Sequence, residues 1–286
     1  MSYGKRNDWL NRTYKNNKTD NTQQAKKIVL FDMDGTLTSP RQPFDDNLFQ
    51  PLSLLSEKSH IGIVTGSDME YLEQQMDFVL NSHLRYKLHL LPCNGTKYYP
   101  PPFSSSDKYS LKSSMNMIDY LGQEHFHDIM RTLISMQNNF DCTGIPLTGH
   151  FIQYRGSMIN WCPIGRNAKS DDRNKFIEYD TSFSPPIRNR LLDSLNSRLS
   201  IHADRKPVTV KLGGDTSFDI FPSGWDKTYA LKYFNKWEVW FVGDRCDLGG
   251  NDKEIYDHLV DTGKSYKTKD THNTKLIIEN EILPKI

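Results

Sequence analysis

The sequence predicts an α/β protein in which a doubly wound parallel sheet carries an inserted α+β domain. The first observation is that apolar runs within 26–35, 60–68 and 237–252 alternate with helix-like stretches, which is typical of buried parallel strands. The second is that the pattern changes to hairpins and helices between residues 100 and 224. The third is that the α/β pattern returns after residue 224, so one domain is predicted to interrupt the other.

The composition is that of a soluble globular protein. The chain has 286 residues, of which 36% are hydrophobic and 25% charged, and its net charge is +1. The near-zero charge argues against nucleic-acid binding, and no apolar run reaches the roughly eighteen residues of a membrane helix. The four cysteines show no Cys-x-x-Cys spacing and no secretory signal is apparent, so we expect reduced thiols and a cytoplasmic location.

The first domain is predicted to begin with a central strand, because Ile28 to Phe31 is continuously apolar. A helix over 45–59, interrupted by Pro51, leads to a second strand within 60–68. Ser67 or Asp68 then caps a helix over 69–82. The segment 86–99 reads as a strand, a turn at Asn94-Gly95 and a further strand.

The inserted domain follows a linker over 100–110. Its predicted elements are a helix over 114–137, a hairpin over 150–165, a segment over 171–182, a helix over 185–201 and two strands within 208–224. A helix starting near Trp225, a strand ending at Gly243-Asp244 and a helix over 253–259 complete the first domain. The predicted organisation is a disordered polar tail (1–26), a catalytic core (27–108 with 223–286) and a substrate-binding cap (109–222).

Three carboxylates follow two of these strands. Asp32 and Asp34 come after the first strand, and Asp244 comes after the strand within 237–252. Ligand sites on open α/β sheets lie at the carboxyl ends of the strands, so these side chains are expected to meet. Asp34 can reach the same site only if the strand has ended, which a turn at Gly35 would permit. Three gathered carboxylates need a cation, and Mg²⁺ prefers such oxygen ligands.

The stretch "FDMDGTLT" resembles the first motif of the haloacid-dehalogenase superfamily of phosphotransferases. The resemblance implies a core of that fold, with Asp32 as the nucleophile that forms an aspartyl-phosphate and Asp34 as the general acid/base. It also implies that Asp32, Asp34 and Asp244 bind Mg²⁺ and that Asp252 supports the ion through a water. By the same resemblance Thr65 in "VTGS" binds the phosphoryl group and Lys227 in "GWDK" neutralises its charge.

Four arginines suggest a second phosphate site, because the planar guanidinium matches phosphate oxygens bidentately. The segments "FIQYRGSMINWCPIGR" and "GGDTSFDIFPSGWDK" resemble the eukaryote-type phosphomannomutase family, and the resemblance runs from about Lys27 to the C-terminus. The substrate-binding residues that it implies are Arg41, Arg155, Arg166, Arg173, Ser217 and Asp219. The implied reaction interconverts mannose 6-phosphate and mannose 1-phosphate through a hexose bisphosphate, with hexose 1,6-bisphosphate as activator, in GDP-mannose supply. The family also implies a homodimer joined through the cap.

Several positions depart from that family. The segment "GDRCDLGGND" adds Asp247, and Tyr256, Asp257 and His258 stand where the family has a second cation site, so that site is not expected here. Thr65 stands where the family usually has glycine, and Cys93 stands where it usually has glutamate. Threonine is common among sugar phosphatases of the superfamily, so a sugar-phosphate phosphatase on the same fold stays open as the alternative function. A non-catalytic binding protein is disfavoured, because Asp32, Asp34 and Lys227 are all in place.

Overall fold

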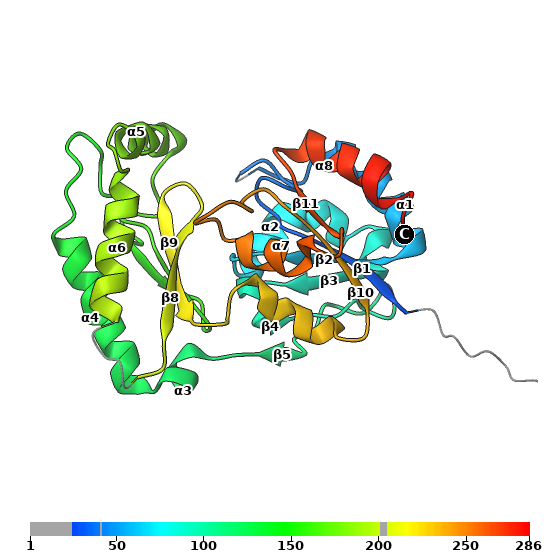
Figure 1. Cartoon of the computed structure of the whole chain (residues 1–286), viewed down its shortest axis with the longest axis horizontal. Coiled ribbons are helices and arrows are strands. Elements are labelled where there is room, and N and C mark those ends of the chain that lie inside the picture. Colours follow the sequence, from blue (N-terminus) through cyan, green and yellow to red (C-terminus); the bar gives the residue numbers. More distant parts are fainter. Residues whose placement is uncertain (1–24, 41, 201–204) are drawn as a thin grey trace, which may run out of the picture.

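Two sheets organise the chain, of which the computed structural model describes residues 25–40, 42–200 and 205–286 (Figure 1). A five-stranded parallel sheet lies in what we call the core, and a four-stranded antiparallel sheet lies in what we call the cap. The parallel sheet with helices on both faces confirms the predicted α/β class. The predicted disordered tail falls almost wholly on residues outside the described ranges.

The core sheet has the strand order β11-β10-β1-β2-β3, which places β1 at its centre. Its strands are β1 (Lys27–Phe31), β2 (His60–Val64), β3 (Leu88–Leu91), β10 (Glu238–Gly243) and β11 (Ser265–Lys267). β1 pairs with β10 on one side and β2 on the other, with Phe31 opposite Val242 and Ile63. The carboxyl ends of β1 and β10 therefore meet at one edge.

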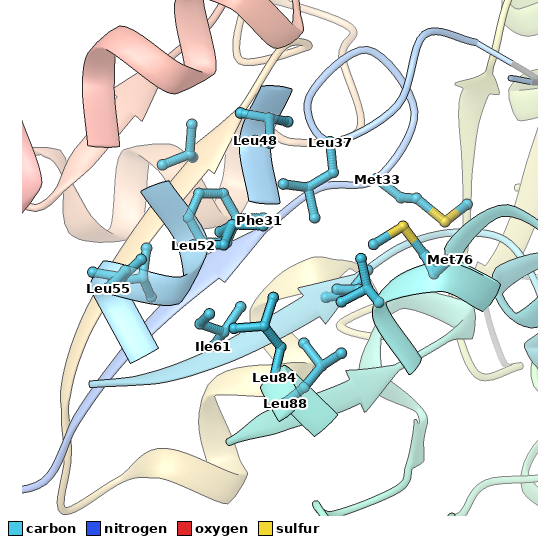
Figure 2. Packing of buried hydrophobic residues seen from close by; sticks show 14 of the residues in the cluster. Phe31, Met33, Leu37, Leu48, Leu52, Leu55, Ile61, Met76, Leu84 and Leu88 are labelled. Atoms are coloured by element: carbon cyan, nitrogen blue, oxygen red, sulfur yellow. The ribbon is translucent and has the colours of Figure 1, made fainter. Parts of the chain in front are cut away.

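The two faces of β1 pack against different helices, because successive side chains of a strand point to opposite sides. Val29 and Phe31 pack with α1 (Phe49–Lys58), α2 (Met69–Leu80) and α8 (Thr271–Ile277). Ile28 and Leu30 pack with the 3₁₀ helix η4 (Lys227–Phe234) and α7 (Lys253–Val260). Figure 2 shows the first face, where Phe31 lies among leucines of the α1 region. Burying each such side chain stabilises the fold by roughly 1.5–3 kcal/mol.

The cap sheet has the order β6-β7-β9-β8. Its strands are β6 (Ile152–Tyr154), β7 (Ile159–Trp161), β8 (Val208–Gly213) and β9 (Ser217–Pro222), and its helices are α3 (Met117–Leu121), α4 (Gln123–Asn138), α5 (Ser170–Thr181) and α6 (Ile187–Leu199). One face packs against α4 and α6 through Phe218 and Ile220. By strand alternation Ser217 and Asp219 lie on the other face, which is turned toward the core.

The chain crosses between core and cap at one end of the cap sheet. One crossing is the ribbon of β4 (Lys97–Tyr98) with β5 (Ser113–Ser114), and the other runs from β9 to η4; both lie along the lower edge of Figure 1. Cys93 and Trp225 pack there with Met158 of the cap. This hinge end is therefore held by apolar contacts as well as by the chain.

Several predicted helices are wrong in detail. The helix predicted over 114–137 is two helices, because the chain breaks at Gly122, whose φ is +88°. The helix predicted near Trp225 is a 3₁₀ helix that starts at Lys227, where Asp226 caps it by accepting from the Thr228 N–H. Over 45–59, a 3₁₀ turn (Asp46–Leu48) precedes α1, and Pro51 lies in the first turn of that helix.

Other elements lay outside the prediction altogether. They are β5, β11, α8, the π-helical turn Ile278–Ile282 and the 3₁₀ turn His83–Tyr86. The 3₁₀ turn Cys93–Gly95, in contrast, lies where a turn at Asn94-Gly95 was predicted. Among the described residues, none of the helices has the length and apolar character needed to cross a membrane.

We predict that two histidines make the protein less stable in mild acid. Burial lowers the pKa of His89 to about 3 and that of His60 to about 4, against an ordinary value of 6.5. His60 Nδ1 lies 3.0 Å from His89 Nε2, and the Tyr98 hydroxyl lies 2.9 Å from His89 Nδ1. Below pH 6.5 these two imidazoles become protonated in the unfolded chain but stay neutral in the folded chain. The free energy of unfolding therefore decreases as the pH falls.

Urea unfolding of the wild type and of His89→Gln at about pH 7.5 and about pH 5.5 checks this. Between these two pH values, we expect the free energy of unfolding of His89→Gln to fall by about 1.4 kcal/mol less than that of the wild type. The matched control is the exposed His127→Gln, which should keep the wild-type dependence. Equal pH dependence in the wild type and His89→Gln would contradict the prediction.

Candidate active site

Asp32 stands at the carboxyl end of β1 and is almost fully buried. Its N–H donates to the Val242 carbonyl of β10 at 2.9 Å, which continues the sheet pairing one residue beyond the strand. Its Oδ1 accepts from Lys227 Nζ at 2.5 Å, and the same ammonium contacts Asp252 Oδ1 at 2.5 Å. Lys227 and Asp252 have no exposed surface, so one buried cation joins two buried carboxylates.

Asp244 completes a cluster of carboxylates at this edge of the sheet. Oxygens of Asp32, Asp244 and Asp252 all lie within 4.8 Å of one another. The chain turns after β1 as expected, with Gly35 at φ +84°. A Cβ on Gly35 would stand 2.4 Å from Asp244 Oδ2, so a side chain at this position would fill the place of that carboxylate.

The cluster holds more negative charge than one lysine balances. Burial, together with the neighbouring Asp252, raises the pKa of Asp32 well above its usual range and that of Asp244 to about 6. Although burial opposes its charge, Asp252 and Asp32 raise the pKa of Lys227, which keeps the ammonium protonated. The Arg245 guanidinium opposes the rise at Asp244, and a further cation would favour the ionised form of both carboxylates.

The residues present fit a hard divalent cation such as Mg²⁺. Asp244 Oδ1 is buried and has no hydrogen-bond partner among the residues that the structure describes. An unpaired buried carboxylate oxygen beside two others is a set of ligands that suits Mg²⁺. Asp34 is not one of the three carboxylates whose oxygens lie within 4.8 Å of one another, and its Oδ1 accepts from the Tyr71 hydroxyl at 3.0 Å. Its part in binding the ion stays a prediction.

A cavity of about 290 Å³ opens in front of the carboxylates, between core and cap. The predicted site residues that line it are Asp32, Asp34, Thr65 and Asp244 from the core and Arg155, Arg166, Arg173, Ser217 and Asp219 from the cap. Lys227 lies beneath the cavity floor, in contact with Asp32. Arg41 falls outside the described residues. The structure thus brings the other predicted residues together around one space.

Asn160 organises the cap wall of the cavity, although the sequence did not single it out. Its Nδ2 donates to Asp219 Oδ1 at 2.8 Å and to Ser217 Oγ at 3.1 Å, and its Oδ1 accepts from Arg166 Nη1 at 2.9 Å. One signal could have found it. In the predicted hairpin a polar residue between the apolar Ile159 and Trp161 points to the face opposite their packing.

Arg155 lines the cavity as predicted and also contacts the core directly. Its guanidinium is buried and donates through Nη1 to the Gly66 carbonyl of the core at 2.8 Å, while Asp219 lies 4.0 Å from the same nitrogen. The neighbouring Thr65 Oγ1 accepts from the Ser67 N–H at 3.1 Å, which shapes this loop. Arg155 therefore ties the cap to the loop that carries Thr65, besides lining the cavity.

The sheet topology, the inserted cap and the site at the strand ends define a haloacid-dehalogenase-like fold. An IMP-nucleotidase of Plasmodium falciparum superposes with a TM-score of 0.58 at 14% identity, over 90% of this chain and 68% of that one. The C-terminal domain of a Candida albicans trehalose-6-phosphate phosphatase gives 0.53 at 17% identity, over 88% and 81%. At these identities the likeness establishes the fold alone.

Sequence similarity goes further. A family model described as eukaryotic phosphomannomutase matches residues 48–283. A phosphomannomutase of Encephalitozoon cuniculi is 35% identical over 240 residues, which cover 82% of this chain and 86% of the relative. One of Saccharomyces cerevisiae is 32% identical over 251 residues, covering 87% and 92%. The chain belongs to the eukaryotic phosphomannomutase family, and the resemblance noted in its sequence is confirmed.

We predict that Mg²⁺ stabilises the folded protein through the carboxylate cluster. At roughly 100 times its dissociation constant the ion should add about 2.7 kcal/mol, seen as a rise in Tm at about pH 7.5. The rise should shrink at about pH 5.5, because protons then compete for Asp244, whose pKa is raised to about 6. Differential scanning fluorimetry at constant ionic strength measures it.

The variant Asp244→Asn should lose most of the Mg²⁺-dependent rise. The exposed Asp261→Asn, which removes the same charge away from the cluster, should keep it. A full rise in Asp244→Asn would show that the ion binds elsewhere.

Proposed function

We propose that the chain is a phosphomannomutase that interconverts mannose 6-phosphate and mannose 1-phosphate through an aspartyl-phosphate and a hexose bisphosphate. The single observation that carries the proposal is the cavity itself. Asp32 stands on its core wall, and the guanidinium groups of Arg155, Arg166 and Arg173 stand on its cap wall. A sugar with a phosphate at either end needs these two walls.

Asp32 is the proposed nucleophile. Its Oδ1 is held by Lys227, so Oδ2 is the oxygen that attacks phosphorus. The ammonium fixes the carboxylate in place and neutralises charge as the phosphoryl group arrives. Mg²⁺, held by Asp32 and Asp244 with Asp34 as a further ligand, would supply positive charge to the phosphoryl oxygens when bound. Thr65, which lines the cavity, would hydrogen-bond the same group.

Asp34 is the proposed general acid/base. It lines the cavity two residues after the nucleophile, and the Tyr71 hydroxyl donates to its Oδ1. This hydrogen bond orients the carboxylate, so that the other oxygen can take the proton of the attacking sugar hydroxyl and return it to the leaving oxygen. Tyr71 is thus a positioning residue that the sequence did not indicate.

The cap residues are proposed to hold the second phosphate and the sugar. Arg155, Arg166 and Arg173, with Arg41 from the core, would bind phosphate oxygens, and Ser217 and Asp219 would bind the sugar hydroxyls and the phosphate. After the first transfer the bisphosphate must turn end for end before the second. The proposal also includes hexose 1,6-bisphosphate as activator, a homodimer joined through the cap, a cytoplasmic location and a role in GDP-mannose supply.

A ³¹P NMR time course tests the proposal. Mannose 6-phosphate is incubated with the protein, Mg²⁺ and a trace of glucose 1,6-bisphosphate, with Asp32→Asn as the control. We expect the mannose 1-phosphate signal to appear with the wild type and to be absent with the variant, because the variant lacks the nucleophile.

Two other outcomes would overturn the proposal. Inorganic phosphate in place of mannose 1-phosphate would establish the sugar-phosphate phosphatase that Thr65 left open. An unchanged spectrum with mannose and glucose phosphates alike would point to a different substrate.

We further predict that Asn160→Ala raises KM for the sugar phosphate by roughly tenfold, with a smaller effect on kcat. The change removes a hydrogen-bond partner that Arg166 and Asp219 share, so both are held less firmly, and a tenfold rise in KM corresponds to about 1.4 kcal/mol of binding. Initial rates over a range of substrate concentrations measure it. The exposed cap variant Asn167→Ala is the matched control; an equal KM in Asn160→Ala and this control would contradict the role.

A further inference from the structure

The end of the cap sheet away from the hinge carries a charged contact with the core. Arg245, next to Asp244 in the core, donates from Nη1 to the Gly214 carbonyl at 3.0 Å and from Nη2 to Asp215 Oδ1 at 2.5 Å. Both acceptors lie in the turn between β8 and β9 of the cap. In Figure 1 this turn lies at the end of the cap opposite the two chain crossings.

A second ion pair crosses the cleft beside the first. Lys211 Nζ of β8 lies 2.5 Å from Glu254 Oε1, in the first turn of α7. Lys211 pairs with Asp219 across the cap sheet, so the two side chains lie on the same face, which is the face turned toward the core. Two charge pairs thus span core and cap at a distance from the apolar hinge end.

The cap is closed over the core in this structure, because residues of the two parts lie close together across the cavity. A Cβ on Gly66 of the core would stand 3.3 Å from Asp219 Oδ2 of the cap. The hinge end is held by Cys93 and Trp225 against Met158. Apolar packing at a hinge tolerates small rotations. Charge pairs at the far end, where a rotation moves the cap most, are sensitive to them.

We propose that the pairs Arg245–Asp215 and Lys211–Glu254 form a latch that holds the cap closed, and that Arg245 is a positioning residue for phosphoryl transfer. This deepens the proposed function and rests on it for its catalytic consequence. The latch places the β8–β9 turn, and with it Ser217 and Asp219, over Asp32. It is also tied to the carboxylate cluster, since the Arg245 N–H donates to Asp252 Oδ2 at 3.0 Å and Arg245 Nε lies 3.7 Å from Asp244 Oδ2.

The latch bears on where the phosphoryl group goes. In the productive step the bond from Asp32 oxygen to phosphorus breaks, a sugar hydroxyl oxygen bonds to phosphorus, and the hydroxyl proton passes to Asp34. When the cap is partly open, water attacks the phosphorus atom in place of the sugar hydroxyl. Inorganic phosphate and free Asp32 result. Closure therefore favours the mutase reaction over hydrolysis. The four side chains are partly exposed, between 20% and 42%, so added salt should weaken the latch.

The experiment replaces the two acidic residues of the latch with their uncharged amides. The double variant Asp215→Asn with Glu254→Gln removes the negative charge from both pairs and leaves Asp32, Asp244 and Asp252 unsubstituted. Asp215→Glu keeps the charge and serves as the conservative rescue. The matched control is Glu238→Gln, which breaks the pair between Lys264 and Glu238, 2.7 Å apart within the core.

Two readouts are compared for each variant. Cap opening is measured without substrate by pulsed EPR between spin labels at Glu57→Cys on α1 and Asn138→Cys on α4, because both positions are exposed and the four native cysteines are buried. Phosphoryl transfer is followed by ³¹P NMR as the ratio of mannose 1-phosphate to inorganic phosphate, together with KM and kcat.

For the double variant we expect a longer and broader distance distribution. We also expect a KM raised several-fold, a larger share of inorganic phosphate and a weaker dependence of KM on salt. Glu238→Gln and Asp215→Glu should behave like the wild type. Distances and product ratio unchanged in the double variant would overturn the latch. A wild type that makes no mannose 1-phosphate, while the distances still lengthen, would overturn the proposed function and leave the latch standing.

Discussion

The site depends on one buried ion triad, in which Lys227 contacts both Asp32 and Asp252. A charge without solvent is costly, so each of these three groups is tolerated only because the others are present. The arrangement links three distant parts of the chain, since Asp32 follows β1, Lys227 begins η4 and Asp252 precedes α7. The same contacts therefore hold Asp32, the proposed nucleophile, in place and join these three parts of the core.

These three groups and the neighbouring Asp244 also leave a surplus of negative charge at the wall of the cavity. Asp244 adds a carboxylate whose Oδ1 has no hydrogen-bond partner within the described part of the chain, and burial raises the pKa of both Asp244 and Asp32. An excess of buried carboxylate is unfavourable for stability, and in the proposed function a divalent cation and then a phosphoryl group would offset it. The proposed active site thus lies where the folded chain leaves buried carboxylates without full charge compensation.

The cap contributes through strand alternation. Asn160 of β7 and Ser217 and Asp219 of β9 are polar and point away from α4 and α6, and Asn160 joins them into one network. The opposite, apolar face anchors the sheet to its helices. Because a strand presents its two faces in strict alternation, the rigid packing of Phe218 and Ile220 positions Ser217 and Asp219 in the cavity. The charged contacts through Arg155 and Arg245 then set the cap against the core.

The sequence by itself determined the parallel sheet and the aspartates at its edge, because a continuous apolar run and the residues that end it are local features. It also carried the family resemblance through its motifs. The joint contact of Lys227 with Asp32 and Asp252, the network around Asn160 and the pairs of Arg245 and Lys211 across the cleft were decided only by the tertiary structure. Each joins residues from separate strands or helices. The break at Gly122 and the 3₁₀ form of η4 belong to the same class, because apolar periodicity alone does not distinguish one long helix from two, or 3₁₀ from α.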